Sequence, residues 1–176
     1  NTNSNTGVID VSASTPGTYT ITYIDIDLST ATFDVTIANG SVYVNDNSAT
    51  GDIFASAAFD GSGNGTAGDP YGTLADAISN LPGCGSDIIY VDAGSYSDDL
   101  IDLTSSQDGL SIIGAGRDLT IFDQSGTGDH FMEIKSSATN ITISDMTIKD
   151  YDENNSGGAI DITSGGTITL QDIHFD

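Results

Sequence analysis

The sequence predicts an all-β protein, most of which forms a parallel β-helix with three short strands in each coil. One observation is the composition, because 26 residues are Asp or Glu but only Glu133 and Glu153 are Glu. Asp and the 21 Gly favour turns and loops, whereas Glu suits helices. The second observation is an alternation of apolar and polar residues with a period of two, which is typical of strands. The third is that short apolar pairs recur between residues 101 and 175 at nearly constant spacing.

Residues 1–39 predict the C-terminal strands of an incomplete β-sandwich. Three alternating runs are present, "GVIDVSA", "GTYTITYIDI" and "TFDVTIA", and "TPG" supplies a turn between the first two. Three strands cannot bury both faces of a sandwich, so we expect earlier strands to precede this segment. The stretches "STPGTYTITY" and "TFDVTIAN" resemble the closing strands of immunoglobulin-like repeats in large secreted bacterial surface proteins.

The second predicted domain, residues 40–176, begins with a short strand, "SVYV", and a Gly-rich loop at residues 59–72. A helix is predicted at residues 73–81, because Thr73 can cap its start and a Pro-Gly pair ends it. The apolar residues of this helix lie three or four positions apart and form one stripe: Leu74, Ala77, Ile78 and Leu81.

Three rows of apolar pairs then recur along the chain, and successive members of a row are 27 to 31 residues apart. The rows are Ile101/Leu103, Met132/Ile134 and Ile160/Ile162; then Leu110/Ile112, Ile141/Ile143 and Ile168/Leu170; then Leu119/Ile121, Met146/Ile148 and Ile173/Phe175. One coil cannot bury its apolar row alone, so stacked coils would form a continuous core. The helix at residues 73–81 is expected to cover the first coil, whose core and strand edges are otherwise exposed.

Several stretches of this second domain resemble a known class of protein. The segments "DGSGNGTAGDPYGTLADAI", "DIIYVDAGSY" and "GLSIIGAG" resemble the opening of right-handed parallel β-helices of the pectin-lyase-like class. "GGAI" and the later "IHF" are similar to repeats of polymorphic β-helical outer-membrane adhesins. The resemblance covers residues 40–176 and implies a right-handed coil.

The formal net charge of −23 limits the classes of partner. Nucleic acids and anionic membranes both need a basic surface, so the sequence excludes them as partners. No apolar run approaches the ~18 residues that cross a bilayer, and we expect no membrane insertion. The first residues, "NTNSNTG", are not typical of a signal peptide, and the last strand ends without a cover. We therefore expect a piece of a longer polypeptide that continues past Asp176, and the resemblance to surface adhesins implies that it is secreted.

The same charge favours cation binding, and calcium is the predicted cofactor. Asp118, Asp145 and Asp172 recur every 27 residues and are predicted to form one column. Equivalent residues of paired strands lie about 4.8 Å apart, where carboxylates repel each other unless a cation bridges them. The alternative is that corners favour Asp and that water screens the charge. A second acidic column is predicted within the first row: Asp102, Glu133 and Asp161.

The Gly-rich loop offers another candidate calcium site. Asp60, Ser62 and Asn64 stand at positions 1, 3 and 5 of a calcium loop, and a Gly follows them at position 6. Position 12 lacks the bidentate Glu of such loops, so Asp69 is the candidate to complete the oxygen set by a different path. The alternative is a metal-free Gly-rich loop that only leads into the helix.

Residues suited to catalysis are scarce, and the sequence predicts no enzyme within these 176 residues. Lyase chemistry of the pectate type needs a basic residue beside calcium, and the chain has only Arg117, Lys135 and Lys149. The signature motifs of polygalacturonase-type enzymes are absent. His174 is predicted to be an ordinary outward side chain, and Cys84 a small residue of a turn.

The resemblance and the acidic composition together predict a structural and adhesive role. The chain is similar to segments of very large adhesins that gliding bacteria export through the type IX system. We expect a stiff stalk or filament at the bacterial surface, with neighbouring copies, surface polysaccharide, or prey or host cells as candidate partners. Two alternatives stay open, which are a carbohydrate-binding or polysaccharide-cleaving module and a self-assembling filament subunit.

Overall fold

The computed structural model describes residues 17–24, 27, 29–37, 40–81, 87–124, 130–151 and 158–176. Within these residues the protein is mostly strands, with one short α-helix and one 3-10 turn, η1 (Ser105–Gln107). The strand expected at "GVIDVSA" and the turn expected at Cys84 both lie outside the described residues.

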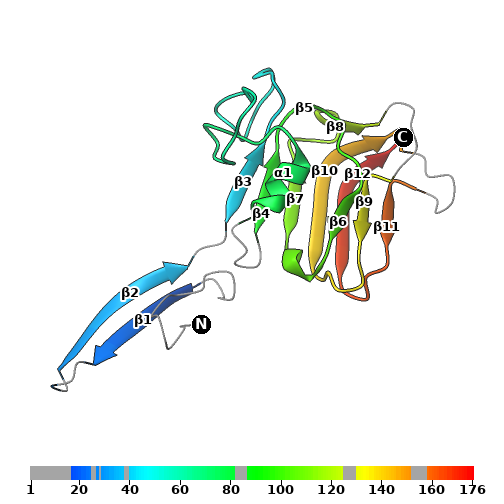
Figure 1. Ribbon diagram of the computed structural model, residues 1–176. Coiled ribbons are helices and arrows are strands. Elements are labelled where there is room, and N and C mark those ends of the chain that lie inside the picture. Colours follow the sequence, from blue (N-terminus) through cyan, green and yellow to red (C-terminus); the bar gives the residue numbers. More distant parts are fainter. Residues whose placement is uncertain are drawn as a thin grey trace.

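Most of the strands belong to two parallel sheets that share one apolar core (Figure 1). The larger sheet has the order β3 (Ser41–Val44), β4 (Ile88–Val91), β7 (Ser111–Gly114), β10 (Ile141–Lys149), β8 (Thr120–Asp123) and β5 (Gly94–Tyr96). β12 (Ile168–Phe175) also pairs with β10 in parallel. The smaller sheet has the order β11 (Ile160–Ile162), β9 (Met132–Ile134) and β6 (Ile101–Leu103).

The predicted fold class is wrong, because the described strands form sheets and not a closed β-helix with three strands in each coil. β10 runs through the second and third predicted rows as one strand, and β12 does the same. Only Ser144 and Asp145 separate the two rows in β10. Asp145 has a φ of 61°, so the backbone changes direction there while β10 stays paired with β12 on both sides.

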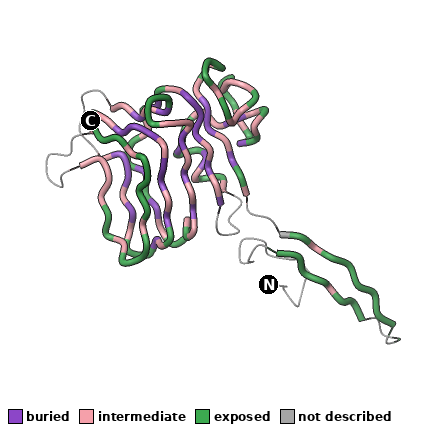
Figure 2. Tube along the Cα trace, turned by 180° about the vertical axis from the view of Figure 1, so that it is seen from behind, coloured by how far each residue is buried: buried purple, intermediate pink, exposed green. Residues whose placement is uncertain are grey.

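The partial β-sandwich predicted for residues 1–39 is also not formed by the described strands. β1 (Gly17–Ile24) and β2 (Thr30–Ile37) pair only with each other, in an antiparallel hairpin. The hairpin projects away from the parallel sheets in both views, and its side chains are almost all exposed (Figures 1 and 2). Two strands have no second layer to bury their faces against, which explains this exposure.

The repeat spacing predicts the strand pairing correctly in two of the three rows. The first row pairs residue for residue across β6, β9 and β11, and the second across β7, β10 and β12. In the third row the pairing is shifted by one residue, because Phe122 and not Ile121 lies opposite Ile148. A shift by one residue exchanges the two faces of a strand, so Phe122 is buried whereas Leu119 is 46% exposed.

Buried apolar side chains from both sheets form a single core, and the buried residues are coloured purple along the chain in Figure 2. Ile112 and Ile143 come from the larger sheet and Leu103 and Ile134 from the smaller one, and all four are fully buried. Successive aromatic rings, with centroids 5.2, 4.7 and 5.5 Å apart, extend this core: Tyr96, Phe122, Phe131 and Tyr151.

The predicted helix is present as α1 (Leu74–Ser79), two residues shorter at its end than expected. Thr73 caps its start as predicted, because the Thr73 hydroxyl accepts a 3.0 Å hydrogen bond from the backbone N–H of Asp76. Leu74 and Ala77 are buried in the core, and the helix lies against β3 and β4.

The two ends of the larger sheet differ in how their strand edges are covered. The outer edge of β3 is bonded to the Gly-rich loop, since Tyr43 N donates to Gly65 O at 3.0 Å and Tyr71 N donates to Tyr43 O at 2.9 Å. At the other end, β12 pairs with one strand only among the described residues, as does β11 at the corresponding edge of the smaller sheet. Their apolar side chains are partly exposed: Ile162 43%, Leu170 39% and Phe175 50%.

Candidate functional site

The acidic column of the first row forms as the spacing predicts, and a lysine lies within it. Asp102 pairs with Glu133, and Glu133 pairs with Asp161. The Lys135 ammonium lies 3.1 Å from Asp102 Oδ2 and 3.0 Å from Glu133 Oε2. Hydrogen bonds to Glu133 and Asp102 raise the pKa of Lys135, so the ammonium stays charged and offsets the repulsion between these carboxylates.

The structure brings two of the three candidate calcium ligands in the other column to equivalent positions. Asp145 and Asp172 lie between paired residues of β10 and β12, and both have positive φ, 61° and 54°. Asp is one of the few residues that tolerate this left-handed conformation. Asp118 does not align with them, because the pairing of β8 with β10 is shifted by one residue. The Arg117 guanidinium lies 3.7 Å from Asp172 Oδ1, and both side chains are exposed.

Lys149, the third of the Lys and Arg residues, also contacts carboxylates. Lys149 Nζ lies 2.8 Å from Asp123 Oδ2 and 3.8 Å from Asp150 Oδ2. Lys149 and Asp123 are paired residues of β10 and β8. Since the sequence has only three Lys and Arg residues, every basic side chain of the protein lies beside an Asp or Glu.

The Gly-rich loop uses its predicted calcium ligands to close turns. Asp60 Oδ1 accepts the N–H of Ser62 at 3.3 Å, and Asn64 Oδ1 accepts the N–H of Thr66 at 3.1 Å. The backbone carbonyl of Asp69 accepts the N–H groups of Asn64 and Gly65. Across the described residues, no group of three or more His, Cys, Asp or Glu side chains is arranged to hold a metal ion.

A buried polar cluster that the sequence analysis did not identify lies at the ends of β3 and β4. Asp92 follows β4, is fully buried, and holds the loop formed by residues 45–59. Its two carboxylate oxygens accept four backbone N–H bonds of 2.6–3.0 Å, from Ile53, Phe54, Ala55 and Ala93. Phe54 packs on Tyr90 of β4, with ring centroids 4.8 Å apart.

Asn45 and Asp52 form the second part of this cluster. Asn45 is fully buried, and its Nδ2 donates to Asp52 Oδ2 at 2.7 Å and to Ala57 O at 2.9 Å. Asn45 Oδ1 and Asp52 Oδ1 are both buried, and neither has a donor among the described residues. Burial raises the pKa of Asp52; the bond from Asn45 opposes this rise, and the negative charges of Asp92 and Asp46 add to it.

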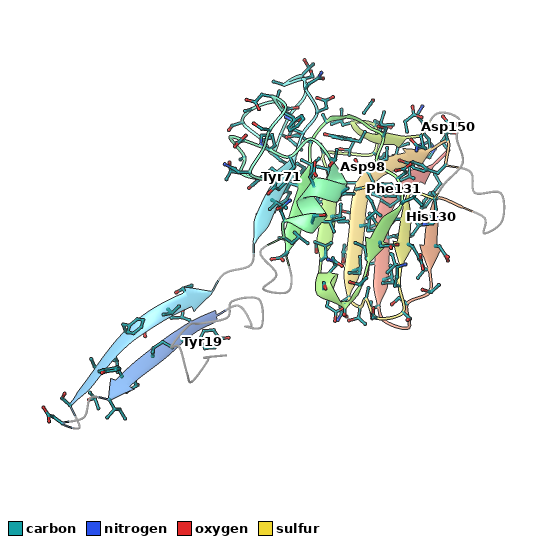
Figure 3. All side chains as sticks on the ribbon, viewed as in Figure 1. Tyr19, Tyr71, Asp98, His130, Phe131 and Asp150 are labelled. Carbon is teal, nitrogen blue, oxygen red and sulfur yellow. The ribbon has the colours of Figure 1, made fainter. Side chains whose placement is uncertain are left out.

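A pocket of about 330 Å³ opens beside this cluster and the start of α1. Asp46, Asp98 and Asp99 line it, together with hydroxyl groups of Ser and Thr residues. Asp98 lies next to α1 (Figure 3) and its Oδ1 accepts the N–H of Ala75 at 3.0 Å. Burial raises the pKa of Asp98, and the helix N–H groups oppose this rise. Gln124 Nε2 donates to Asp99 Oδ2 at 2.7 Å, which orients this carboxylate.

One sequence signal could have indicated the buried cluster. Asn45 and Asp92 each follow a Val that ends a short apolar run, and these two Val residues are paired in the structure. Polar residues directly after paired parallel strands meet at one end of a sheet. The sequence predicts the strand at residues 41–44 but not its pairing with β4, and this pairing brings Asn45 and Asp92 to the same end of the sheet.

Comparisons with protein-family models, with curated proteins and with solved structures found no match for this chain. In the part of the chain that the structure describes, no helix is long and apolar enough to cross a membrane. Function therefore has to be inferred from the geometry of the residues themselves.

Proposed function

We propose that this chain is a structural and adhesive module of a large extracellular bacterial surface protein, and that it has no catalytic activity of its own. The observation that carries the proposal is the edge formed by β11 and β12, where both sheets present strand backbone and partly exposed apolar side chains. Such an edge binds further strands readily. The two parallel sheets share one core, and their strands pair in register. This arrangement supports a stiff element that extends by adding strands at this edge.

The charge distribution supports attachment to surfaces that are not themselves acidic. All three Lys and Arg side chains contact carboxylates, so the net charge of −23 comes from acidic groups that have no Lys or Arg counterpart. An acidic surface repels nucleic acid and anionic lipid. This charge favours three kinds of partner, which are neutral polysaccharide, basic protein surfaces and targets coated with divalent cations.

Adhesion measurements on the whole chain test the proposal. Beads coated with the protein should adhere to polysaccharide-coated or cell-coated surfaces more strongly than beads coated with heat-unfolded protein. Leu170→Asp places a charge on the open edge and should weaken adhesion, whereas Ile53→Asp changes an exposed apolar residue outside that edge and should not. Equal adhesion by the native chain, the heat-unfolded protein and Leu170→Asp, or cleavage of the polysaccharide by the native chain, would reject the proposal.

A carbohydrate-binding module is the second candidate, and the pocket beside α1 favours it. Carboxylate and hydroxyl oxygens, here from Asp46, Asp98, Asp99, Ser95 and Ser97, are groups that hydrogen-bond sugar hydroxyls. Three carboxylates in one pocket repel acidic sugars and fit neutral or amino sugars. Calorimetric titration with neutral, amino and acidic oligosaccharides tests this candidate, and no binding heat from any of them would reject it.

We also propose that calcium binds at the paired carboxylates of Asp145 and Asp172. Their equivalent positions on β10 and β12 support this choice, because strands spaced by about 4.8 Å bring such carboxylates together. The Gly-rich loop is a weaker candidate, since the oxygens of Asp60 and Asn64 already accept hydrogen bonds from their own turns.

A further inference from the structure

The buried cluster beneath loop 45–59 contains two oxygen atoms that lack a hydrogen-bond donor among the described residues. Asn45 Oδ1 and Asp52 Oδ1 are both buried without a donor among the described residues. The two side chains already touch, because Asn45 Nδ2 donates to Asp52 Oδ2 at 2.7 Å. Buried polar atoms in folded proteins nearly always have a partner, so a missing partner calls for a specific explanation.

We propose that Asp52 is a neutral carboxylic acid in the folded protein and that its Oδ1–H donates to Asn45 Oδ1. The pair then closes as a ring of two hydrogen bonds, since an amide and a carboxylic acid each offer one donor and one acceptor on neighbouring atoms. A single proton supplies the donor that Asn45 Oδ1 needs and turns Asp52 Oδ1 from an acceptor into a donor.

The surrounding charges favour a proton on Asp52. Asp92 at the end of β4 and Asp46 at the start of the loop both act on Asp52 with negative charge. Tyr96 on β5 is the other titratable group coupled to these acids; burial and the three carboxylates raise its pKa, so it stays neutral. Burial is the largest contribution to the raised pKa of Asp52, and the two neighbouring carboxylates act in the same direction.

A bound cation fits the cluster less well than a proton. Calcium needs six to eight oxygen ligands. Both oxygens of Asp92 are already occupied by two N–H donors each, and Asp46 Oδ1 accepts the N–H of Ser48 at 2.7 Å. A proton needs only the two oxygens that lack a donor.

The protonated pair makes the closure of loop 45–59 dependent on pH. The pKa of Asp52 in the folded chain is raised above its ordinary value of 3.8. The stabilisation by the neutral pair is therefore complete below 3.8, decreases between 3.8 and the raised pKa, and is lost above it. Once Asp52 ionises, three carboxylates repel one another and the loop loosens, which exposes the ring of Phe54 and the face of Tyr90 beneath it.

A carboxyl carbon NMR titration of the native chain tests the protonated pair directly, with the Asp52→Asn variant used to assign the signal. We expect the Asp52 signal to titrate clearly above the ordinary value of 3.8. A midpoint at or below that value would overturn the proposal. So would a shift of the signal on adding millimolar calcium chloride that a chelator reverses, because a cation would then occupy the site.

Hydrogen exchange of the amides in residues 53–55 tests the effect on the loop. In the native chain, protection corrected for the intrinsic rate should fall about tenfold for each pH unit between 3.8 and the raised pKa. Asp52→Asn keeps a permanent N–H donor to Asn45 and should make protection independent of pH in this window. Asp60→Asn removes the same charge from an exposed turn and should keep the native slope. An equal pH slope in native chain and Asp52→Asn would overturn the proposal, and if that variant does not fold, the titration of the native chain decides.

Discussion

Replacing Asp92 with Ala should release loop 45–59 from the end of β4. The carboxylate accepts four backbone N–H bonds, from Ile53, Phe54, Ala55 and Ala93. A hydrogen bond to a charged acceptor contributes about 1.5 kcal/mol at the lower end of its range, so four such bonds would sum to about 6 kcal/mol if they acted independently. Ile53 is 61% exposed, and its amide finds water once the carboxylate is gone. We therefore expect Asp92→Ala to destabilise the closed loop by about 3–4 kcal/mol.

Hydrogen exchange resolved by residue measures this loss where it occurs. The amides of residues 53–55 should lose nearly all protection, whereas urea unfolding of the sheets, followed by far-UV circular dichroism, should change less because loops open locally. Asp108→Ala is the matched control, since Asp108 accepts a single exposed N–H from Thr139 at 2.7 Å, and it should cost about 1 kcal/mol. Native protection of residues 53–55 in Asp92→Ala would show that this carboxylate does not hold the loop.

The remaining predictions concern the parallel sheets. A Cβ atom at Gly114 would collide with the backbone carbonyl of Asp145, so Gly114→Ala should destabilise the chain to urea by about 1–3 kcal/mol, whereas Gly165→Ala meets open space and should be nearly neutral. Phe122→Ala should cost about 3–5 kcal/mol and Leu119→Ala less than about 1 kcal/mol; the reverse order would contradict the observed register of β8. If calcium bridges β10 and β12, a chelator should lower the Tm of the native chain, and an unchanged Tm would remove calcium from the proposed function.

Local apolar patterns predict which residues pair but not how the strands connect. The spacing of the first two rows gives the observed register because a buried face fixes pairing to the residue. It does not show that β10 and β12 each continue through two rows as one strand, since that depends on Asp145 and Asp172 adopting a positive φ where the strand changes direction. The wrong placement of Leu119 in the core has a similar origin. Leu119 and Phe122 are both apolar, and only the path of the chain in three dimensions determines that Phe122 is the buried one.

Predicting the candidate site was harder, because carboxylates look alike in a sequence. Periodicity predicts the first-row acidic column and the equivalent positions of Asp145 and Asp172, but it wrongly adds Asp118 to that second column. Asp92 and Asp52 belong to no period, and their burial results from a long loop folding back onto the end of β4. Only the pairing of β3 with β4 brings Asn45 and Asp92 to the same end of the sheet.

The three buried or half-buried acids of this region show three different ways in which an Asp-rich chain stabilises a carboxyl group away from water. Asp92 is surrounded by backbone N–H donors, and Asp98 accepts an N–H at the start of α1. Asp52 has one N–H donor, from Asn45, and two acidic neighbours, and the proposed proton on Asp52 supplies the donor that Asn45 Oδ1 lacks. Burial raises the pKa of both Asp52 and Asp98. If Asp52 titrates like an exposed Asp, its missing donor must be supplied by another group, and the loop would not respond to pH.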